Sequence, residues 1–392
     1  MKIFIIPSWY PSDSNPIYGI FNQEQARMMA RERQNWSVGV SKWGQGDEPF
    51  LLRGKDPKSI IKYFRKFTDS EVQLADNLKE YFSGAFTWTR RIRRGNIDGI
   101  IRANDKNLQR FISDFGKPDV ISAQASYPAA LVASALSEKY SIPFTVTIRM
   151  SPFPFPQYDA GNRQLKSILN VPLRRAAILI CTSDDLKRKV ESYGFDKVMT
   201  LNNPVDTDLF KLETPQTDDE ITVLAVGRIE EQKGIDLLLE ALAQVPDVKL
   251  RIAGKGSFLK KYMNLSEKLG LSNRVTWLGE LSRDKTAKEM QKCSFYVLSS
   301  RHETFGNVVV EAMACGKPVV ATKCGGPSEL VTDVAGYLCE VEVQDLARKI
   351  AQMAESLESF DSAKIRNHVV NQHSPSVWIQ HLEQTFKSIV SN

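Results

Sequence analysis

The sequence has few of the residues that build metal sites and disulfide frameworks. It contains five cysteines, none of them arranged as CxxC, and only four histidines in 392 residues. A zinc site or a set of structural disulfides is therefore not expected. Thiols without a disulfide framework fit a reducing cytoplasm, where we expect this protein to be located.

Long apolar segments and a strong excess of one charge are also missing. No run approaches the roughly 20 apolar residues that a membrane-spanning helix needs. The apolar run at 3–6 is too short for a signal peptide and indicates a first strand. The 52 Lys and Arg against 46 Asp and Glu leave a charge of +6, which suits an anionic ligand but does not by itself indicate nucleic acid.

The chain instead shows a repeated alternation of short apolar runs and helical patterns, such as those at 22–32 and 128–140. This alternation is typical of a parallel sheet covered by helices on both faces. Strands are expected at 2–6, 37–41, 119–122, 144–148, 178–181 and 198–201, and again at 221–227, 248–254, 274–279, 294–300 and 318–322.

A polar stretch at 202–220 with two prolines separates the two series and is the best linker candidate. The sequence therefore predicts an α/β protein of two Rossmann-like, doubly wound domains. Ligands of such sheets bind outside the carboxyl ends of the strands, so a cleft between the domains is the expected active site. The segment 374–392 has the pattern of a capped amphipathic helix.

Glu303 and Glu311 bracket an apolar run that should be buried. Eight helical residues would separate them by ~12 Å, further than the ~5–9.5 Å of a two-carboxylate glycosidase. Two carboxylates that contact two parts of one long ligand fit this spacing better. The alternative is that Glu311 makes a surface salt bridge and Glu303 is solvated; spacing alone does not decide between them.

Cationic and glycine-containing segments follow other expected strands. Arg228 and Lys233 could neutralise a diphosphate without a metal, or form a solvated charge pair with neighbouring glutamates. Gly254 could allow a ligand close to the backbone, or serve an ordinary turn. Gly19, at a helix start, could present N–H groups to a phosphate. The dinucleotide fingerprint G-x-G-x-x-G is absent there, which weakens an NAD interpretation.

Two further features have open interpretations. Arg149 ends an expected strand and could bind a substrate oxygen or only pair with an acid. Segments 58–67 and 87–95 interleave basic and aromatic residues, which suits contact with an anionic membrane surface. A solvated helix face with an apolar side in the core is the alternative for those segments.

Taken together, these motifs resemble glycosyltransferase family 4. The segment "ETFGNVVVEA" matches its E-x7-E motif, "VGRIEEQKGIDLLLEAL" resembles its diphosphate-binding segment, and "WYPSDSNPIYGIFNQEQA" resembles its N-terminal loop. The resemblance covers nearly the whole chain and is strongest at 221–340. It implies the GT-B fold, with an acceptor domain at 1–205 completed by the helix at 375–392, and a donor domain at 206–374.

The resemblance also implies roles for individual residues. Glu303 would contact donor-sugar hydroxyls and Glu311 the ribose hydroxyls, while Arg228 and Lys233 would hold the diphosphate. The other implied donor-binding residues are Gly19, Gly254, Leu281, Phe305, Gly306, Asn307 and Val308. Members of the family often carry His where Arg149 and Gln124 stand here. Arg exchanges protons poorly, so Arg149 would orient the donor sugar or the acceptor instead.

The implied activity is retaining transfer of a hexose from a nucleotide diphosphate sugar, either UDP- or GDP-linked, to a glycan or lipid-linked acceptor. No metal or other cofactor is expected, nor nucleic acid as a partner; peripheral contact with the inner face of an anionic membrane is expected. Two alternatives remain at this point. A nucleotide-sugar epimerase could use the same architecture, and a non-enzymatic two-lobed protein could bind free sugar.

Overall fold

The computed structural model describes residues 1–13, 15–45, 68–87, 95–213 and 220–390. The chain divides into two compact units. The first consists of Met1–Cys181, Lys187–Leu201 and Ile379–Asn392, and the second of Thr182–Leu186 and Asn202–Trp378. Within the described ranges, no helix is both long and apolar enough to cross a membrane. Most of the basic-aromatic segments at 58–67 and 87–95 lies outside the described residues.

The first unit is built on a sheet that has eight strands among the described residues, in the order β10-β9-β6-β5-β1-β2-β4-β3. Neighbouring strands are parallel, except that β3 runs antiparallel to β4. The strands are β1 (Lys2–Pro7), β2 (Ser37–Lys42), β3 (Ser70–Ala75), β4 (Leu78–Phe82), β5 (Val120–Gln124), β6 (Phe144–Ile148), β9 (Ile178–Cys181) and β10 (Val198–Thr200).

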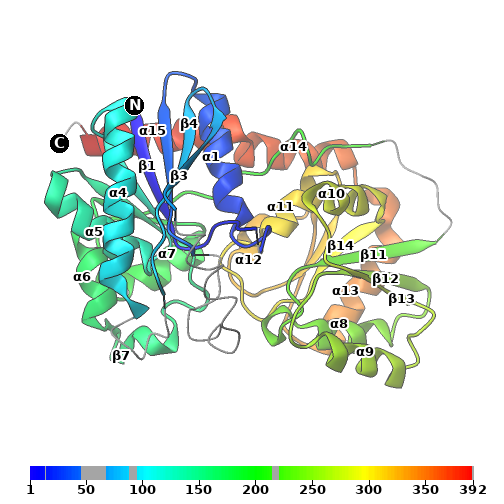
Figure 1. Ribbon diagram of the computed structural model, residues 1–392. Helices are drawn as coiled ribbons and strands as arrows, with labels where there is room; N and C mark the ends of the chain where they lie inside the picture. The colour runs from blue at the N-terminus through cyan, green and yellow to red at the C-terminus, as the bar shows by residue number, and fades with distance from the viewer. Residues whose placement is uncertain (14, 46–67, 88–94, 214–219, 391–392) are drawn as a thin grey trace. The chain divides into compact units, whose positions relative to one another are not determined.

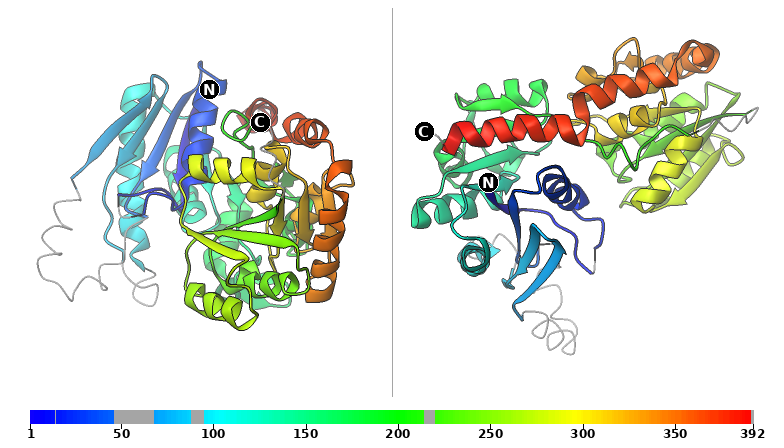
Figure 2. Two further views of the ribbon diagram at one scale, coloured as in Figure 1. Left: turned by 90° about the vertical axis from the view of Figure 1, so that its right-hand side faces the viewer. Right: turned by 90° about the horizontal axis from the view of Figure 1, so that it is seen from above.

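Helices cover both faces of this sheet, as the alternating sequence pattern predicts. In Figure 1, α4 (Ile97–Phe115) and α5 (Ala129–Tyr140) pack on one side, and α1 (Ile20–Glu32) lies on the other. The long helix α15 (Pro375–Val390) is seen from above in Figure 2. Its Phe386 packs against Trp36, with ring centroids 6.4 Å apart. The remaining elements are α6 (Ser167–Arg175), α7 (Asp184–Glu191), η2 (Pro156–Tyr158), and a small hairpin of β7 (Asp159–Gly161) and β8 (Gln164–Leu165).

The second unit contains a wholly parallel sheet with six strands in the described part of the chain, ordered β13-β12-β11-β14-β15-β16. The strands are β11 (Ile221–Val226), β12 (Val248–Ala253), β13 (Val275–Gly279), β14 (Phe295–Leu298), β15 (Val319–Thr322) and β16 (Gly336–Cys339). The helices are α8 (Ile235–Leu242), α9 (Leu259–Lys268), α10 (Arg283–Lys292), α11 (Asn307–Ala314), α12 (Pro327–Leu330), α13 (Val343–Ser356) and α14 (Ser362–His373), with short 3-10 turns η3 (Glu231–Lys233) and η4 (Leu357–Ser359).

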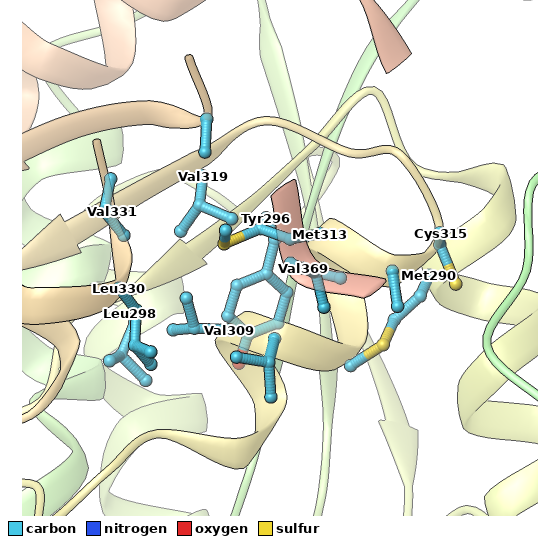
Figure 3. Close-up of a cluster of buried hydrophobic side chains, with 14 of the residues drawn as sticks. Met290, Tyr296, Leu298, Val309, Met313, Cys315, Val319, Leu330, Val331 and Val369 are labelled. Carbon is cyan, nitrogen blue, oxygen red and sulfur yellow. The ribbon is translucent and has the colours of Figure 1, made fainter. Parts of the chain in front are cut away.

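The core of the second unit lies on both faces of its sheet, because successive strand residues point to opposite sides. On β14, Phe295 joins the cluster beneath α8 and α13, whereas Tyr296 joins the cluster beneath α11 and α14. Figure 3 shows Val309 and Met313 of α11 beside Tyr296. The apolar residues of α11 thus fix that helix against the sheet, and with it the position of Glu311.

The predicted α/β fold with two Rossmann-like sheets is confirmed, but three strands of those sheets (β3, β4 and β16) and the small β7–β8 hairpin were not predicted. β3 and β4 form an antiparallel edge, and the side chains of β3 are almost all exposed. Such a strand carries no apolar alternation by which it could be recognised. β16 has only four residues, two of them half-buried, and it is too short to produce a pattern.

Candidate functional site

Lys233 and Glu303 meet beyond the carboxyl ends of two neighbouring strands. β11 and β14 pair in parallel, and their following loops carry the two residues. Lys233 Nζ donates a hydrogen bond to Glu303 Oε1, and Ser300 Oγ donates to the same oxygen at 2.9 Å. The side chains of the lysine and glutamate are 18% and 12% exposed, so this ion pair is mostly shielded but still reachable.

The two loops are joined by a set of contacts that we call the 231–236/299–303 seam. Arg301 donates two hydrogen bonds, each 2.9 Å, to the two carboxylate oxygens of Asp236. The Arg301 N–H donates to Gln232 O at 2.7 Å, and Ser299 Oγ donates to Lys233 O at 3.0 Å. This paired geometry is the strong form of an arginine–carboxylate contact, and it fixes the distance between the loops.

Glu311 is buried in α11, and its two oxygens have different surroundings. Oε1 accepts a hydrogen bond of 2.8 Å from Arg283 of α10, whose guanidinium lies 4.8 Å from the centre of the Phe210 ring. Oε2 is buried with no hydrogen-bond partner in the described part of the chain. An unsatisfied buried carboxylate oxygen is costly, so Oε2 marks a point where a ligand hydroxyl can donate.

The start of α11 lies between the two carboxylates in sequence. Gly306 has φ 95°, and no side chain of the described residues caps the helix, so the N–H groups of Asn307 and Val308 can bind an anion. Asn307 Oδ1 accepts from Asn203 Nδ2 at 2.8 Å, and Val308 packs half-buried against the core. Phe305 is 2% exposed and contacts His373 edge-on, so its side chain belongs to the core and only its backbone faces the loop.

The loop after β11 presents Arg228 to solvent. Its neighbour Glu230 is occupied elsewhere, because it accepts hydrogen bonds of 2.8 and 2.6 Å from the backbone and hydroxyl of Ser257. These bonds lower the pKa of Glu230, and the nearby Arg228 charge adds a smaller effect. The basic residues of this loop therefore do not form a closed group with the adjacent glutamates.

The glycines after β12 are explained by backbone packing. A Cβ on Gly254 would lie 1.8 Å from Gly227 O, and one on Gly256 would lie 2.2 Å from Ile229 O. These two positions let the loop after β12 pass close to the loop after β11. Leu281 lies half-buried just beyond β13.

Gly19 and Arg149 belong to the first unit. Gly19 has φ 70°, and a Cβ there would lie 2.4 Å from the carbonyl carbon and oxygen of Trp9, so this glycine allows the loop after β1 to fold against the start of α1. Asn22 Nδ2 ties the same loop by donating to Trp9 O at 2.6 Å.

Arg149 follows β6 and contacts residues of β5 and α1. Its Nη2 donates to Gln25 Oε1 at 2.8 Å and to Gln124 Oε1 at 3.2 Å, and the guanidinium lies 4.9 Å from the centre of the Phe21 ring. Burial lowers the pKa of Arg149 to about 9, which still leaves the side chain cationic at neutral pH. The two positions where family members often carry His are thus in direct contact here.

Sequence reasoning missed the residues that hold the site together. Arg283, Ser300, Arg301 and Asp236 are ordinary polar residues on a loop or at a helix start, and no motif distinguishes them. Arg283 lies 28 positions from Glu311, and Arg301 lies 65 positions from Asp236. Ser300 is the exception, because its partner Glu303 is three residues away. The one sequence signal that could have identified any of them is that Ser300 and Arg301 lie just before Glu303, the first glutamate of the E-x7-E segment.

The second-unit site can therefore hold an elongated anionic ligand with hydroxyl groups. Lys233, Arg228 and the start of α11 supply positive charge, and Glu303 and Glu311 supply hydrogen-bond acceptors. Among residues that the structure describes, no three His, Cys, Asp or Glu side chains gather as a metal site.

Two family models match adjacent segments of the chain. Glycosyl transferases group 1 matches residues 206–367, and Glycosyltransferase Family 4 matches residues 84–209. The uncharacterized glycosyltransferase MJ1178 of Methanocaldococcus jannaschii is 32% identical over 242 residues, which cover 61% of this chain and 66% of the relative. The lipopolysaccharide core biosynthesis glycosyltransferase LpsE of Rhizobium meliloti is 31% identical over 200 residues, covering 49% and 57%. The chain thus spans from just over half to about two thirds of the length of these two relatives.

Solved structures share the architecture at low sequence identity. Sucrose-phosphate synthase from Thermosynechococcus elongatus has a TM-score of 0.78 at 18% identity, over 100% of this chain and 99% of that one. Anabaena HepE, solved in complex with UDP and glucose, has a TM-score of 0.70 at 22% identity, over 99% and 100%. These likenesses confirm the predicted GT-B fold. The two family matches, which together span residues 84–367, show that this chain belongs to the glycosyltransferases.

Proposed function

We propose that this chain is a retaining glycosyltransferase that moves a hexosyl group from a nucleoside diphosphate sugar to a hydroxyl of a glycan or lipid-linked acceptor. The observation that carries this proposal is the site of the second unit: Lys233 paired with Glu303, and Glu311 Oε2 buried without a partner among the described residues. A role in surface polysaccharide or glycolipid synthesis is supported by similarity to the lipopolysaccharide core enzyme of Rhizobium.

Each part of the donor would meet a different part of this site. Lys233 and Arg228 would bind the diphosphate, aided by the N–H groups at the start of α11. Glu303 would accept hydrogen bonds from the sugar, and Glu311 Oε2 would accept one from the ribose. The backbone near Leu281 and Gly254 would contact the base and ribose, and Gly19 and Arg149 would act from the first unit.

The reaction would need no protein nucleophile. The bond from the anomeric carbon to the diphosphate oxygen breaks, and the acceptor oxygen forms its bond on the same face. The acceptor proton passes to the departing phosphate oxygen. The cationic residues stabilise the charge that develops on the diphosphate, and the two carboxylates orient the sugar and ribose.

The donor would be a UDP- or GDP-sugar, and the cations of Lys233 and Arg228 would take the place of a resident metal. UDP and glucose are the ligands named for the similar Anabaena structure, which favours testing uridine nucleotides first. We also propose that the protein acts in the cytoplasm at the inner membrane face, through the basic-aromatic segments at 58–67 and 87–95.

A thermal-shift screen against UDP-, GDP- and ADP-sugars tests the donor proposal, because a ligand that binds the folded state raises the unfolding temperature. One nucleotide sugar should raise it and then be hydrolysed slowly or transferred. NMR of the product should show the anomeric configuration of the donor. If no nucleotide sugar in the panel binds or turns over, the proposed function is wrong.

A further inference from the structure

A small pocket opens in the first unit at the carboxyl ends of three adjacent strands. Trp9 follows β1, Ser126 and Tyr127 follow β5, and Met150 follows β6, and all four line it. In this sheet β5 and β2 lie on opposite sides of β1, so the chain changes winding direction there. Ligands of doubly wound sheets bind at such a switch point.

The walls of this switch-point pocket are largely aromatic. Trp9 and Phe155 are half-buried and keep part of their rings accessible, whereas Tyr158 is 5% exposed. The Tyr127 and Tyr158 rings lie 5.6 Å apart at 41°, which fixes one wall. The face of an aromatic ring carries partial negative charge and attracts the polarised C–H groups on one side of a pyranose ring.

One residue of the lining, Ser126, carries a buried hydroxyl group that has no hydrogen-bond partner among the described residues. Ser126 is 1% exposed, and its Oγ makes no hydrogen bond to any residue that the structure describes. The preceding Ala125, also in the lining, has φ 85°, a left-handed conformation that is uncommon without glycine. The backbone is thus held in an unfavourable conformation immediately before the lining residue that carries this hydroxyl.

Among the residues that the structure describes, no charged side chain belongs to the pocket lining. The nearest cation in sequence, Arg149, donates to Gln25 and Gln124 and stacks over Phe21. A phosphorylated occupant would need a cation or several free N–H groups to replace its hydration. The lack of a cation in the described lining therefore favours a neutral, polyhydroxylated ring.

We propose that the switch-point pocket recognises the acceptor by taking one edge of a neutral pyranose ring, stacked against Trp9 and Phe155 and hydrogen-bonded to Ser126. This inference rests on the proposed glycosyl transfer and narrows its acceptor to a glycan or glycoside rather than a phosphorylated headgroup.

The test titrates the full-length chain with methyl α- and β-pyranosides of glucose, galactose, mannose and N-acetylglucosamine, followed by saturation-transfer NMR. The 6-phosphates of the same sugars serve as charged probes. At least one methyl glycoside should bind saturably below ~10 mM, with the strongest transfer to its ring C–H protons, and its 6-phosphate should bind more weakly.

Variants assign the binding to the pocket. Trp9→Ala should weaken binding about tenfold, and Trp9→Phe should retain most of it, because the aromatic face remains. Ser126→Ala should weaken binding about three- to tenfold. The matched control is Thr145→Val, which removes another buried hydroxyl without a partner in the described structure, from β6 but outside the pocket lining.

The possible results separate the two proposals. If a nucleotide sugar binds but no methyl glycoside does, or if the 6-phosphates bind better, the neutral-acceptor inference is wrong and the donor function stands. Equal loss of binding in Thr145→Val and Ser126→Ala would also overturn the pocket assignment. If no nucleotide sugar binds the same protein, the proposed transferase function itself fails.

Discussion

Glu303 is held in place by its neighbours before any ligand binds. Its carboxylate accepts hydrogen bonds from Lys233 Nζ and Ser300 Oγ, and its N–H donates to Cys324 O at 2.8 Å. A side chain that is already oriented needs little reorganisation when charge develops in a transition state. This contact set argues against a freely solvated Glu303, one of the two interpretations that the sequence left open.

Replacing this carboxylate tests its role directly. Glu303→Gln keeps the shape but removes the charge, and we expect kcat/KM to fall roughly 10- to 100-fold, because a hydrogen bond to a charged group contributes ~1.5–3 kcal/mol. Steady-state kinetics and the unfolding temperature should be measured together. The matched control is Glu289→Gln, which alters another partly buried ion pair of the second unit, with Arg251; equal losses in both variants would remove Glu303 from the site.

Glu311 differs from a surface salt-bridge residue because only one of its oxygens is paired in the described structure. We expect wild-type protein to bind a nucleoside diphosphate about tenfold more tightly than its 2′,3′-dideoxy analogue, through Oε2. Glu311→Gln should lose most of that preference, since an amide is a weaker acceptor than a carboxylate. Calorimetric titration of both ligands against both proteins measures the coupling; an unchanged preference would place the ribose elsewhere.

Arg149 and Gln124 both depart from the residues that the family often carries at these positions, and the two departures are structurally linked. Each stands where family members often carry His, and the structure joins them by a 3.2 Å hydrogen bond. The amide oxygens of Gln124 and Gln25 both accept from the same Arg149 nitrogen. A glutamine in place of His supplies a neutral acceptor at every pH, which suits a partner that is cationic at neutral pH.

His373 provides a pH-dependent test of the second-unit core. Burial lowers its pKa to about 4 from 6.5, so between these values the unfolded chain binds a proton that the folded chain does not. Stability is therefore fully present above pH ~6.5 and falls as the pH drops toward 4, by about 3 kcal/mol in total. The unfolding temperature of His373→Phe should lose this component, whereas the exposed His381→Phe should not; parallel pH profiles for wild type and His373→Phe would contradict it.

Among the elements, the 231–236/299–303 seam depends on one glycine. Gly234 has φ 59°, and a Cβ there would lie 2.1 Å from Ser299 O. Gly270 has a similar φ of 72°, and no described residue would lie within 4 Å of a Cβ there. Comparing alanine variants of Gly234 and Gly270 separates the free-energy cost of a left-handed backbone from that of a steric clash.

We expect Gly270→Ala to lower the free energy of unfolding by about 1 kcal/mol, through backbone strain alone. Gly234→Ala should cost clearly more and should also weaken nucleotide binding, because the carbonyl of Ser299 must move. Urea unfolding and nucleotide titration of both variants measure the two effects. If the two variants had similar unfolding free energies and similar nucleotide affinities, the seam would tolerate displacement of the Ser299 carbonyl.

The E-x7-E segment was the most predictable element of the site. The apolar run before Glu311 was expected to be helical and buried, and α11 does carry Glu311 in a helix that begins at Asn307. Apolar spacing and a following glycine determine such a helix locally. The pairing of Glu303 with Lys233 could not be read in this way, because the two residues lie 70 positions apart and meet only when β11 and β14 pair.

At the scale of the whole molecule, the basic-aromatic segments at 58–67 and 87–95 support a test of membrane contact. We expect the protein to float with vesicles that contain anionic lipid at low salt and to be released at high salt, because the attraction is electrostatic and screened. Neutral vesicles are the control. Failure to float with anionic vesicles at low salt would rule out this part of the proposal.

The sequence by itself determined most of the succession of strands and helices in both halves, because most of the parallel strands are apolar runs and most of the covering helices have their own periodicity. It also determined the residue types available for a diphosphate and a sugar. The tertiary structure alone decided which of these residues meet. Strand order, not chain order, places β14 beside β11 and β5 beside β1. That order creates the Lys233–Glu303 pair and the switch-point pocket, since contacts between distant segments depend on how the sheets assemble and leave no local pattern.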